Sequence, residues 1–399
     1  MSGGVWIGGI GMISAIGNNV TETLESLEAG RSGVGDMQYL HSAHRGVIPV
    51  AEVPLSNEAL ASAARAPERL TRTALLSLIA ARETLDSAGW RPLPALRTGF
   101  ISANTVGGMD KTEQFYRYFM QNPDSGRLRD VVHHESGSIT EVVAERLGIT
   151  GFISTVSTDC SSSANSILLG ARMIRQGMLD VVLAGGVDAL TAFTLNGFNT
   201  LMILDRAPCR PFDQNRAGLN LGEGAGYVLL LSEKALQERG IAPLCRLNGW
   251  YNATDAYHQT ASSPEGTGSF LAMTGALAKA GLQPADIGYI NVHGTGTPNN
   301  DQSEGTALRR VFGEQCPPFS STKAFTGHTL GASGGIEAVL SVLSVQQGLI
   351  YPNLRFTTPI EGLGLKPEVT FRKGVRVRHV LSNSFGFGGN CTSLVFSER

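Results

Sequence analysis

The chain has 399 residues, of which 42% are hydrophobic and 17% charged, a composition typical of a globular protein large enough to bury a deep pocket. Its formal net charge of -2 excludes the overall positive charge by which many proteins bind nucleic acid. No apolar run approaches the ~18 residues that a membrane-spanning helix needs. The 5 cysteines are scattered and form no CxxC pair, which argues against disulfides and a zinc site and favours a cytoplasmic protein.

Strands and helices alternate along the first part of the chain. Apolar runs predict buried strands, and apolar residues at helical spacing predict amphipathic helices. The expected strands cover residues 4–14, 97–104, 152–158 and 180–190, and the expected helices cover 69–89 and 161–177. This alternation predicts an α/β fold whose connections cross over a sheet.

The same layout recurs in the second part of the chain. After a strand and a helix within 223–240, the order of elements repeats. The expected segments are a strand at 244–255, a helix and then a strand within 269–297, a helix at 334–348, and closing strands within 377–398. Two halves of similar layout, 1–240 and 241–399, predict an internally duplicated fold with a site between the halves.

One cysteine stands at the junction between a predicted strand and a predicted helix. Cys160 follows the strand at 152–158 and precedes three serines, a residue type that caps helix starts. The helix dipole favours a thiolate there, and the strand-to-helix turn projects the side chain outward. Cys160 is therefore a candidate nucleophile. The cysteines expected to pack as small buried hydrophobes are Cys209, Cys245 and Cys316.

Two histidines of the second half lie in glycine-flanked loops. His293 ends a predicted strand in NVHGTGTPNND, and His328 follows Lys323 by five positions in STKAFTGHTLGASGGIEA. The spacing lacks metal-ligand pairs, but a thiol, two imidazoles and a cation suit acyl transfer. The histidines expected to be structural hydrogen-bonding groups are His41, His44, His258 and His379.

Five motifs in order carry a resemblance to a known family. They are VSTDCSSSAN, RPFDQNRAGLNLGEGAG, HGTGTPNND, KAFTGHTLGASGGIEA and NSFGFGGN. Together they resemble an elongating, type I/II β-ketoacyl-acyl-carrier-protein synthase of the thiolase-like superfamily. The resemblance implies two mirrored βαβαβαββ halves in five αβαβα layers, and decarboxylative Claisen condensation of an acyl group with malonyl-acyl carrier protein. It also implies no organic cofactor, and a homodimer or a heterodimer with a related chain.

The resemblance implies roles for the candidate catalytic residues. Cys160 would accept the acyl group. His293 and His328 would hold the malonyl thioester, assist loss of CO2 and stabilise the enolate, with Lys323 supporting His328. The backbone amides of Cys160 and Phe387 would form an oxyanion hole, and Phe387 would also gate the acyl pocket.

Further positions match supporting and binding residues of the family. Thr295 and Thr297 would bind the phosphopantetheine arm. Glu337 would be structural or order water, with a monovalent cation near Asn291 and Ser384. The acidic carrier protein would dock on a basic patch. The arginines at the corresponding positions are Arg65, Arg69, Arg127, Arg129 and Arg206.

Two segments depart from the family pattern. The chain ends in GGNCTS, with Asn390 and Cys391 where relatives often have Thr-Asn. The expected acyl pocket contains polar residues, whose burial against a saturated chain would be costly. The residues of this expected pocket are Met109, Asp110, His133, His134 and Glu135. A polar, aromatic or conjugated acyl chain is therefore expected, as in aryl-polyene-type pathways. Alternatively, these residues pair with one another at the dimer interface.

Other classes remain open at this point. A silent chain-length partner would share the fold but lack the cysteine, which Cys160 argues against. A thiolase would use a second cysteine in the C-terminal half, and Cys391 lies there, although the pair of Lys323 and His328 favours the synthase. A type III initiating synthase would carry asparagine in place of one histidine, and His328 argues against that class.

Overall fold

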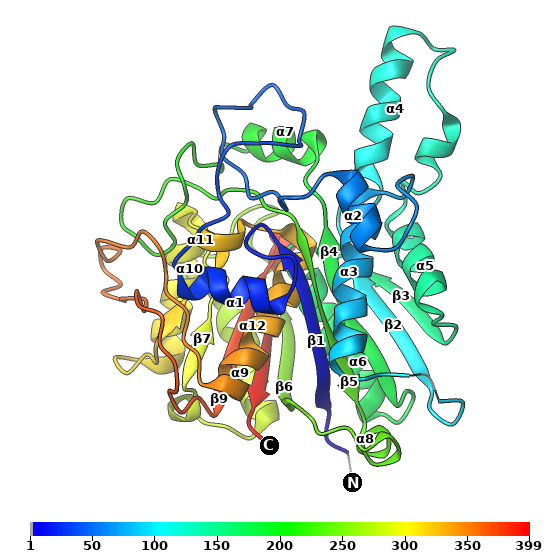
Figure 1. The fold of residues 1–399 in the computed structure, drawn as a ribbon. Coiled ribbons are helices and arrows are strands. Elements are labelled where there is room, and N and C mark those ends of the chain that lie inside the picture. The colour runs from blue at the N-terminus through cyan, green and yellow to red at the C-terminus, as the bar shows by residue number, and fades with distance from the viewer. Residues whose placement is uncertain (1–2, 92) are drawn as a thin grey trace.

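The computed structural model describes residues 3–91 and 93–399 and contains one ten-stranded sheet flanked and interleaved by helices (Figure 1). The first half contains β1 (Trp6–Ser14), α1 (Val20–Glu28), α2 (Asn57–Ala63), α3 (Arg72–Ser87), β2 (Thr98–Ala103), α4 (Met109–Gln121), η1 (Leu128–Val131), α5 (Ser136–Leu147), β3 (Phe152–Val156), α6 (Ser162–Arg175), β4 (Val181–Asp188), α7 (Ala192–Thr200), β5 (Gly224–Leu231) and α8 (Glu233–Arg239). The second half contains β6 (Cys245–Thr254), α9 (Thr267–Ala280), η2 (Pro284–Asp286), β7 (Tyr289–Asn291), α10 (Pro298–Phe312), β8 (Phe319–Ser320), α11 (Lys323–Thr326), η3 (Leu330–Ala332), α12 (Ser333–Gln347), β9 (His379–Phe385), η4 (Phe387–Gly389) and β10 (Asn390–Ser397).

The strand order shows that the two halves share one topology. The first half is ordered β3-β2-β4-β5-β1, and the second half, read inward from its own edge, is ordered β8-β7-β9-β10-β6. In each half the first two pairings are parallel and the next two antiparallel. A short pairing of β1 with β6 joins the halves at Trp6 and Ile7. The predicted duplicated α/β fold is therefore confirmed.

Two central helices, α6 and α12, lie between the strands of the first half and those of the second. α6 and α12 contact each other and strands from both halves, whereas α3 covers β1 and β5 and α9 covers β6 and β10. α6 forms as the sequence predicts, because small and apolar residues line its inward side, with Ile167 and Ala171 completely buried. The result is the layering expected from the resemblance, with α6 carrying the cysteine loop into the centre of the molecule.

The crossover from β2 to β3 differs most from its counterpart in the second half. The β7 to β8 crossover carries α10, but the β2 to β3 crossover carries α4, η1 and α5, and α4 projects from the body (Figure 1). Several apolar side chains of this projection are exposed, including Tyr116, Tyr118 and Met120. No helix is predicted here from the sequence, and α4 contacts mainly η1 and α7.

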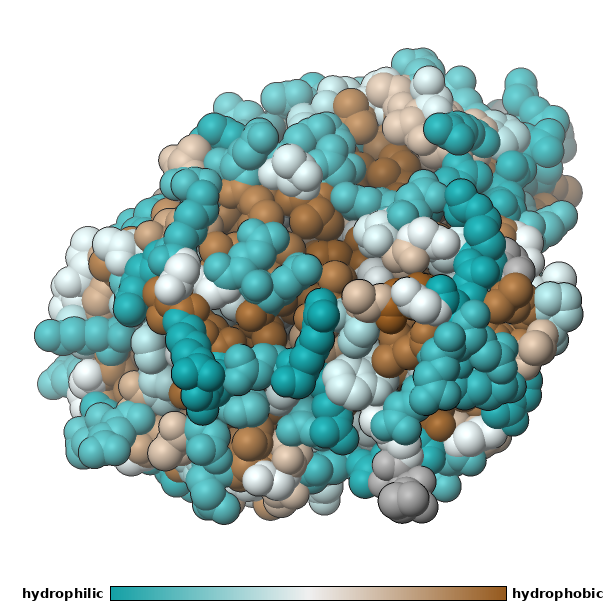
Figure 2. All heavy atoms as spheres, turned by 60° about the horizontal axis from the view of Figure 1, so that its bottom comes forward, coloured by the Kyte–Doolittle hydropathy of each residue, from teal (hydrophilic) through white to brown (hydrophobic). Residues whose placement is uncertain are grey.

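Among the helices within the described residues, none is long and apolar enough to cross a bilayer. Figure 2 shows one face of the molecule, on which apolar side chains lie in patches crossed by long polar ones. Such a mixed surface is usual for a folded chain.

Candidate active site

The loop between β3 and α6 places Cys160 at the start of a buried helix. Asp159 adopts φ +51°, a left-handed conformation that few residues other than glycine adopt, and so forms a sharp elbow. The Ser162 hydroxyl accepts from the Thr158 amide at 2.8 Å and donates to the Asp159 carbonyl at 2.5 Å, which holds the elbow closed. The Cys160 side chain is therefore fixed with only 5% of its surface exposed.

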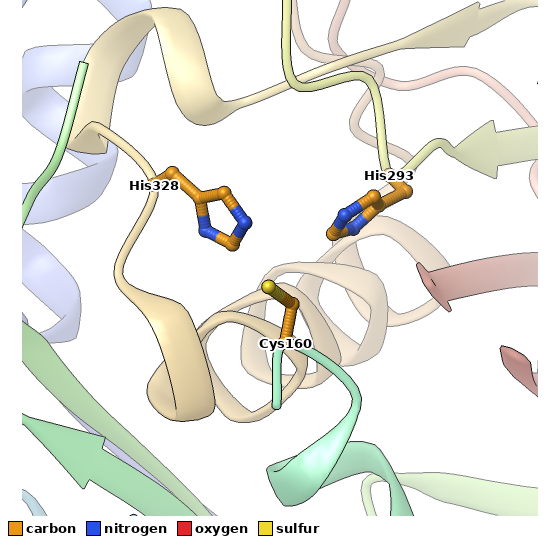
Figure 3. A group of neighbouring side chains, drawn as sticks. All are labelled: Cys160, His293 and His328. Carbon is orange, nitrogen blue, oxygen red and sulfur yellow. The ribbon is translucent and has the colours of Figure 1, made fainter. Parts of the chain in front are cut away.

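The structure brings Cys160 together with both predicted histidines. One sulfur or nitrogen atom from each of Cys160, His293 and His328 lies within 4.8 Å of the other two. The two imidazole rings are 5.4 Å apart between centroids and nearly perpendicular, and Figure 3 shows both directed toward the thiol. The nucleophile thus comes from the first half of the chain and both imidazoles from the second.

Glu304 of α10 positions His293 and was not found from the sequence. Its carboxylate accepts from the backbone amides of His293 at 2.9 Å and Gly294 at 2.8 Å, and from the Asn383 side chain at 3.2 Å. The carboxylate is fully buried, which raises the pKa of Glu304 to about 7. Glu304 therefore fixes the backbone from which His293 projects.

His328 is held in one tautomer by its own loop. The Leu330 amide donates to His328 Nδ1 at 3.2 Å, and the Ser333 hydroxyl lies 3.1 Å from the same atom. A neutral imidazole that accepts at Nδ1 carries its proton on Nε2. His328 therefore offers an N–H donor to the reaction centre.

The electrostatic surroundings keep both imidazoles neutral. Burial, together with the nearby Lys323 ammonium, lowers the pKa of His293 and of His328 well below 6.5. Burial and the Asp159 carboxylate raise the pKa of Cys160 to about 12, opposed by Lys323 and the Phe387 amide. This burial works against the resting thiolate expected from the helix dipole. A raised pKa favours the protonated thiol at rest.

Lys323 contacts a carboxylate. Its ammonium donates to Glu337 Oε1, and both side chains are almost completely buried, 2% and 3% exposed. Burial raises the pKa of Glu337 to about 7, against the opposing effect of Lys323. The Lys323 charge contributes to the lowered pKa of both histidines.

A cavity of about 210 Å³ leads to the site from the second half. Thr295 and Thr297 line it together with Cys160, His293 and His328, and the two threonine hydroxyls are 2.9 Å apart. Both predicted phosphopantetheine-binding threonines therefore lie on the approach to the thiol. We call this space the entrance cavity.

A second cavity of about 200 Å³ extends from Cys160 into the first half, and we call it the acyl cavity. Its wall consists of Thr105, Val106, Met109, Asp159, Cys160, Phe193, Thr194, Phe198, Leu330 and Phe387. Phe387 and Phe198 line both cavities, and their rings stack with centroids 5.9 Å apart. Phe387 thus occupies the place expected of a gate. Phe198 was not found from the sequence.

The structure places four of the five expected acyl-pocket residues outside the acyl cavity. Met109 lines the acyl cavity, but Asp110 lines a separate cavity and accepts from the Arg72 amide at 2.8 Å. Successive helical residues point about 100° apart, so α4 cannot direct both side chains to one side. His133 bonds to Ser138, and both His134 and Glu135 are exposed outside the two cavities that reach Cys160.

Asp188 joins the acyl cavity to the His328 loop and was also missed. This fully buried carboxylate accepts from the Thr105 amide at 2.8 Å, the Thr105 hydroxyl at 2.7 Å and the Gly331 amide at 2.7 Å. Burial raises the pKa of Asp188 to about 6. Its contacts lie more than 80 residues apart in the chain, so no local pattern indicates them.

The remaining candidates lie away from the thiol. Cys391 is buried beside Ala272 and Phe385, outside both cavities, so it does not supply the second cysteine of a thiolase site. All 5 cysteines are free. The five candidate docking arginines, Arg65, Arg69, Arg127, Arg129 and Arg206, are all exposed, and none forms an ion pair with another described residue.

The duplicated fold and the Cys-His-His site together define a thiolase-like condensing enzyme. Family models described as the N-terminal and C-terminal domains of β-ketoacyl synthase match residues 3–235 and 244–357. The chain therefore belongs to the β-ketoacyl synthase family. It is a β-ketoacyl-acyl-carrier-protein synthase, an acyltransferase that forms β-ketoacyl-acyl carrier protein in chain elongation.

Relatives match the chain over its whole length. It is 32% identical to 3-oxoacyl-[acyl-carrier-protein] synthase 2 of Staphylococcus aureus (strain COL), covering 99% of this chain and 98% of the relative. It is 34% identical to nodulation protein E of Rhizobium meliloti (strain 1021), covering 99% of each. Among solved structures, the ishigamide ketosynthase/chain length factor superposes with a TM-score of 0.93 at 28% identity, covering 100% of both chains. The ketosynthase ApeO, in complex with its chain length factor ApeC from Xenorhabdus doucetiae, superposes with a TM-score of 0.86 at 32% identity, covering 100% and 98%.

Proposed function

We propose that this enzyme elongates conjugated, polyene-type or aryl-primed acyl chains, as the catalytic subunit of a heterodimer with a related chain. The observation that carries the substrate class is the aromatic wall of the acyl cavity, formed by Phe193, Phe198 and Phe387. Stacked or edge-on aromatic contacts contribute roughly 0.5–1.5 kcal/mol each beyond area burial. A flat conjugated chain can make such contacts along its length, whereas a saturated chain cannot.

The geometry supports a division of the reaction between the two cavities. The Cys160 thiol attacks the acyl thioester, its proton passes to the departing pantetheine sulfur by way of a neighbouring imidazole, and the acyl group remains on Cys160. The amides of Cys160 and Phe387 stabilise the oxyanion, and Phe387 lines both cavities together with Cys160. The position of Cys160 and Phe387 on the walls of both cavities supports an oxyanion hole at the junction of the two.

Condensation follows at the same junction. Malonyl thioester enters past Thr295 and Thr297, and donors from His293 and His328 hold its carbonyl. Loss of CO2 leaves an enolate, whose carbon attacks the acyl carbonyl and releases the Cys160 sulfur, which regains a proton. Neutral imidazoles suit this step, because the N–H group of a neutral imidazole can donate a hydrogen bond to the enolate oxygen.

Buried oxygen atoms beside the site fit a monovalent cation. Asn291 Oδ1, Ser384 Oγ and Glu337 Oε2 are buried and have no hydrogen-bond partner among the described residues. Ser384 packs on Gly334, one turn before Glu337 on α12, and Asn291 is paired with Ser382 on the same strand as Ser384. Such hard oxygen ligands suit an alkali cation, which would hold the elements behind His293 and His328 together.

The free edge of β3 supports the pairing with a second chain. β3 ends the sheet, carries no charged residue or proline, and exposes 39% of Phe152 and 38% of Ile153. An uncharged, unprotected edge strand is a template for strand addition. Two of the structurally similar enzymes are described with a chain length factor, which supports a heterodimeric partner here.

We infer that the acidic carrier protein docks through exposed arginines, with Arg65, Arg69, Arg127, Arg129 and Arg206 as the candidates. Arg206 follows α7, which carries Phe193 and Phe198 of the acyl cavity, whereas Arg127 and Arg129 lie on the projecting crossover. Their exposed, unpaired guanidinium groups are free to meet acidic side chains.

The decisive experiment compares carrier proteins loaded with conjugated and saturated acyl chains of equal length. Elongation, read by mass with and without a candidate partner chain, should favour the conjugated substrate and require the partner. Phe198→Leu should reduce that preference, whereas Phe119→Leu, which changes an aromatic residue of α4 outside the acyl cavity, should leave it unchanged. Equal rates on both substrates would contradict the substrate class, and full activity without a partner would contradict the heterodimer.

A further inference from the structure

Asn390 lies in GGNCTS, where the chain departs from the family pattern, and several hydrogen bonds meet at its side chain. Its Oδ1 accepts from three donors: Ser161 Oγ at 2.7 Å, Asn165 Nδ2 at 2.8 Å and Asn252 Nδ2 at 2.8 Å. The donors belong to the start of α6 and to β6, whereas Asn390 begins β10. One oxygen atom therefore joins three elements from both halves of the chain.

Additional hydrogen bonds close this cluster. The Thr392 hydroxyl donates to Asn165 Oδ1 at 2.7 Å, and Asn252 Nδ2 donates to Thr392 Oγ1 at 2.8 Å. Asn165 Nδ2 also reaches Thr158 Oγ1 at 2.9 Å, on the loop that precedes Cys160. We call this group, made of Ser161, Asn165, Asn252, Asn390 and Thr392, the asparagine clasp.

The clasp connects the two segments that provide the oxyanion amides. Ser161 directly follows Cys160, and Phe387 lies three residues before Asn390 in a segment whose glycines Gly388 and Gly389 have φ of 72° and 79°. The backbone of Asn390 also accepts from Gly386 at 2.8 Å. Glycines leave this segment flexible, so an anchor on each side is needed to set where its amide points.

We propose that Asn390 is a positioning residue that sets the distance between the Cys160 and Phe387 amides by tying the η4 segment to the start of α6. Asn390 lines neither the entrance cavity nor the acyl cavity, so it acts through the residues it holds. The proposal rests on the oxyanion role given to these two amides above.

The chemistry of the side chain defines the variants that test this role. Aspartate keeps an oxygen that accepts all three donors, leucine keeps the shape but accepts none, and threonine offers one hydroxyl with two lone pairs. Asn390→Asp should therefore preserve the clasp, Asn390→Leu should open it, and Asn390→Thr should weaken it. Asn248→Leu is a matched control, because Asn248 lies on β6 outside the clasp and donates only to the Ala280 carbonyl.

The experiment measures single-turnover acylation of Cys160 by a carrier protein loaded with an acyl group. In parallel, it measures alkylation of Cys160 by iodoacetamide. Alkylation needs the thiol but no oxyanion hole. Asn390→Leu should lower the maximal acylation rate about a hundredfold, the effect of misplacing a group by about 1 Å, with the half-saturating substrate concentration unchanged. Alkylation should stay close to that of the unmodified enzyme. Asn390→Thr should lie between, and Asn390→Asp and Asn248→Leu should acylate normally.

Two results would overturn the proposal. One is normal acylation in Asn390→Leu, or in Asn390→Thr if the leucine variant does not fold. The other is an equal loss of acylation and alkylation that Asn390→Asp does not restore, which would make the clasp merely structural. Failure of the proposed function itself is distinguishable, because Cys160→Ala would then still be acylated in the otherwise unmodified enzyme.

Discussion

The two halves of the chain have the same strand order but carry different chemistry at equivalent places. After β3 the first half places Cys160 at the start of a helix, and after β8 the second half places Lys323. After β2 the first half supplies Met109 of the acyl cavity, and after β7 the second half supplies His293. Duplication thus brings loops of both halves to one point. In the proposed mechanism the tasks are divided: the first half holds the acyl chain, and the second half handles the malonyl carboxylate and the enolate.

The largest expected effect comes from removing the nucleophile while keeping the second half intact. Cys160→Gln should lower condensation by roughly 10⁴-fold or more, the scale seen when a catalytic nucleophile is lost. Malonyl decarboxylation should continue, because His293 and His328 remain. Release of CO2 and formation of β-ketoacyl product, measured on the same sample, check this separation. Condensation in this variant would place the nucleophile elsewhere.

The reverse change removes the function of the second half. In the Cys160→Gln background, replacing His293 or His328 by alanine should lower decarboxylation by roughly 10²–10³-fold, the usual loss for one oxyanion donor. His379→Ala is the matched control, because His379 bonds to Ser397 at the opposite end of β9 from Phe385, which lines the entrance cavity. Decarboxylation that survives both catalytic replacements would show that the enolate is stabilised by other groups.

Because Lys323 and Glu337 form a buried ion pair, replacing one of them by a neutral residue should lower the stability of the protein. Glu337→Gln leaves the Lys323 ammonium buried without its counter-ion and should lower the free energy of unfolding by about 3–5 kcal/mol. Glu314→Gln breaks the exposed pair with Arg309, in which the Glu314 side chain is 91% exposed, and should cost less than about 1 kcal/mol. Denaturant unfolding compares the two, and similar midpoints would mean that Lys323 finds another partner.

The pH dependence of the thiol decides between burial and the helix dipole. If burial keeps the pKa of Cys160 near 12, the thiolate fraction increases with pH throughout the range below that value. Alkylation of Cys160 by iodoacetamide should then accelerate about tenfold per pH unit from pH 7 to pH 9. A plateau within this range would show that the dipole of α6 dominates and that the thiolate is the resting form.

The smallest effect is expected at the surface. Changing Arg65, Arg69 and Arg206 together to glutamate should weaken carrier-protein binding about tenfold at low salt, and the effect should fade as salt screens the charges. The matched control changes three exposed arginines of another surface to glutamate: Arg246, Arg376 and Arg378. Unchanged affinity in the docking variant at low salt would move the docking surface elsewhere.

The sequence predicted most of the sheet and the reactive centre, because both depend on local patterns. Apolar runs identified β1, β2 and β4, and helical spacing identified α3 and α6. Cys160 could be found because its serine-rich helix start is contiguous in the chain. The order of the strands in the two halves, in contrast, required the structure.

Residues that act through distant partners could not be predicted. Glu304 accepts a hydrogen bond from the backbone amide of His293, and Asp188 accepts one from the backbone amide of Gly331 in the His328 loop. No spacing rule connects either carboxylate to its histidine. The acyl-pocket prediction failed at Asp110 for a local reason, because the rotation of α4 was unknown, and Met109 was therefore grouped with a neighbour that points elsewhere.

The most direct test of the division between the halves is peptide mass spectrometry after the enzyme has been incubated with a carrier protein that is loaded with an acyl group, in the absence of malonyl substrate. The acyl mass should be found on the peptide that contains Cys160, should be absent from Cys160→Ala, and should be released as β-ketoacyl product when malonyl-acyl carrier protein is added. Acylation of Cys391 or of another residue, with the Cys160 peptide unmodified, would contradict the account.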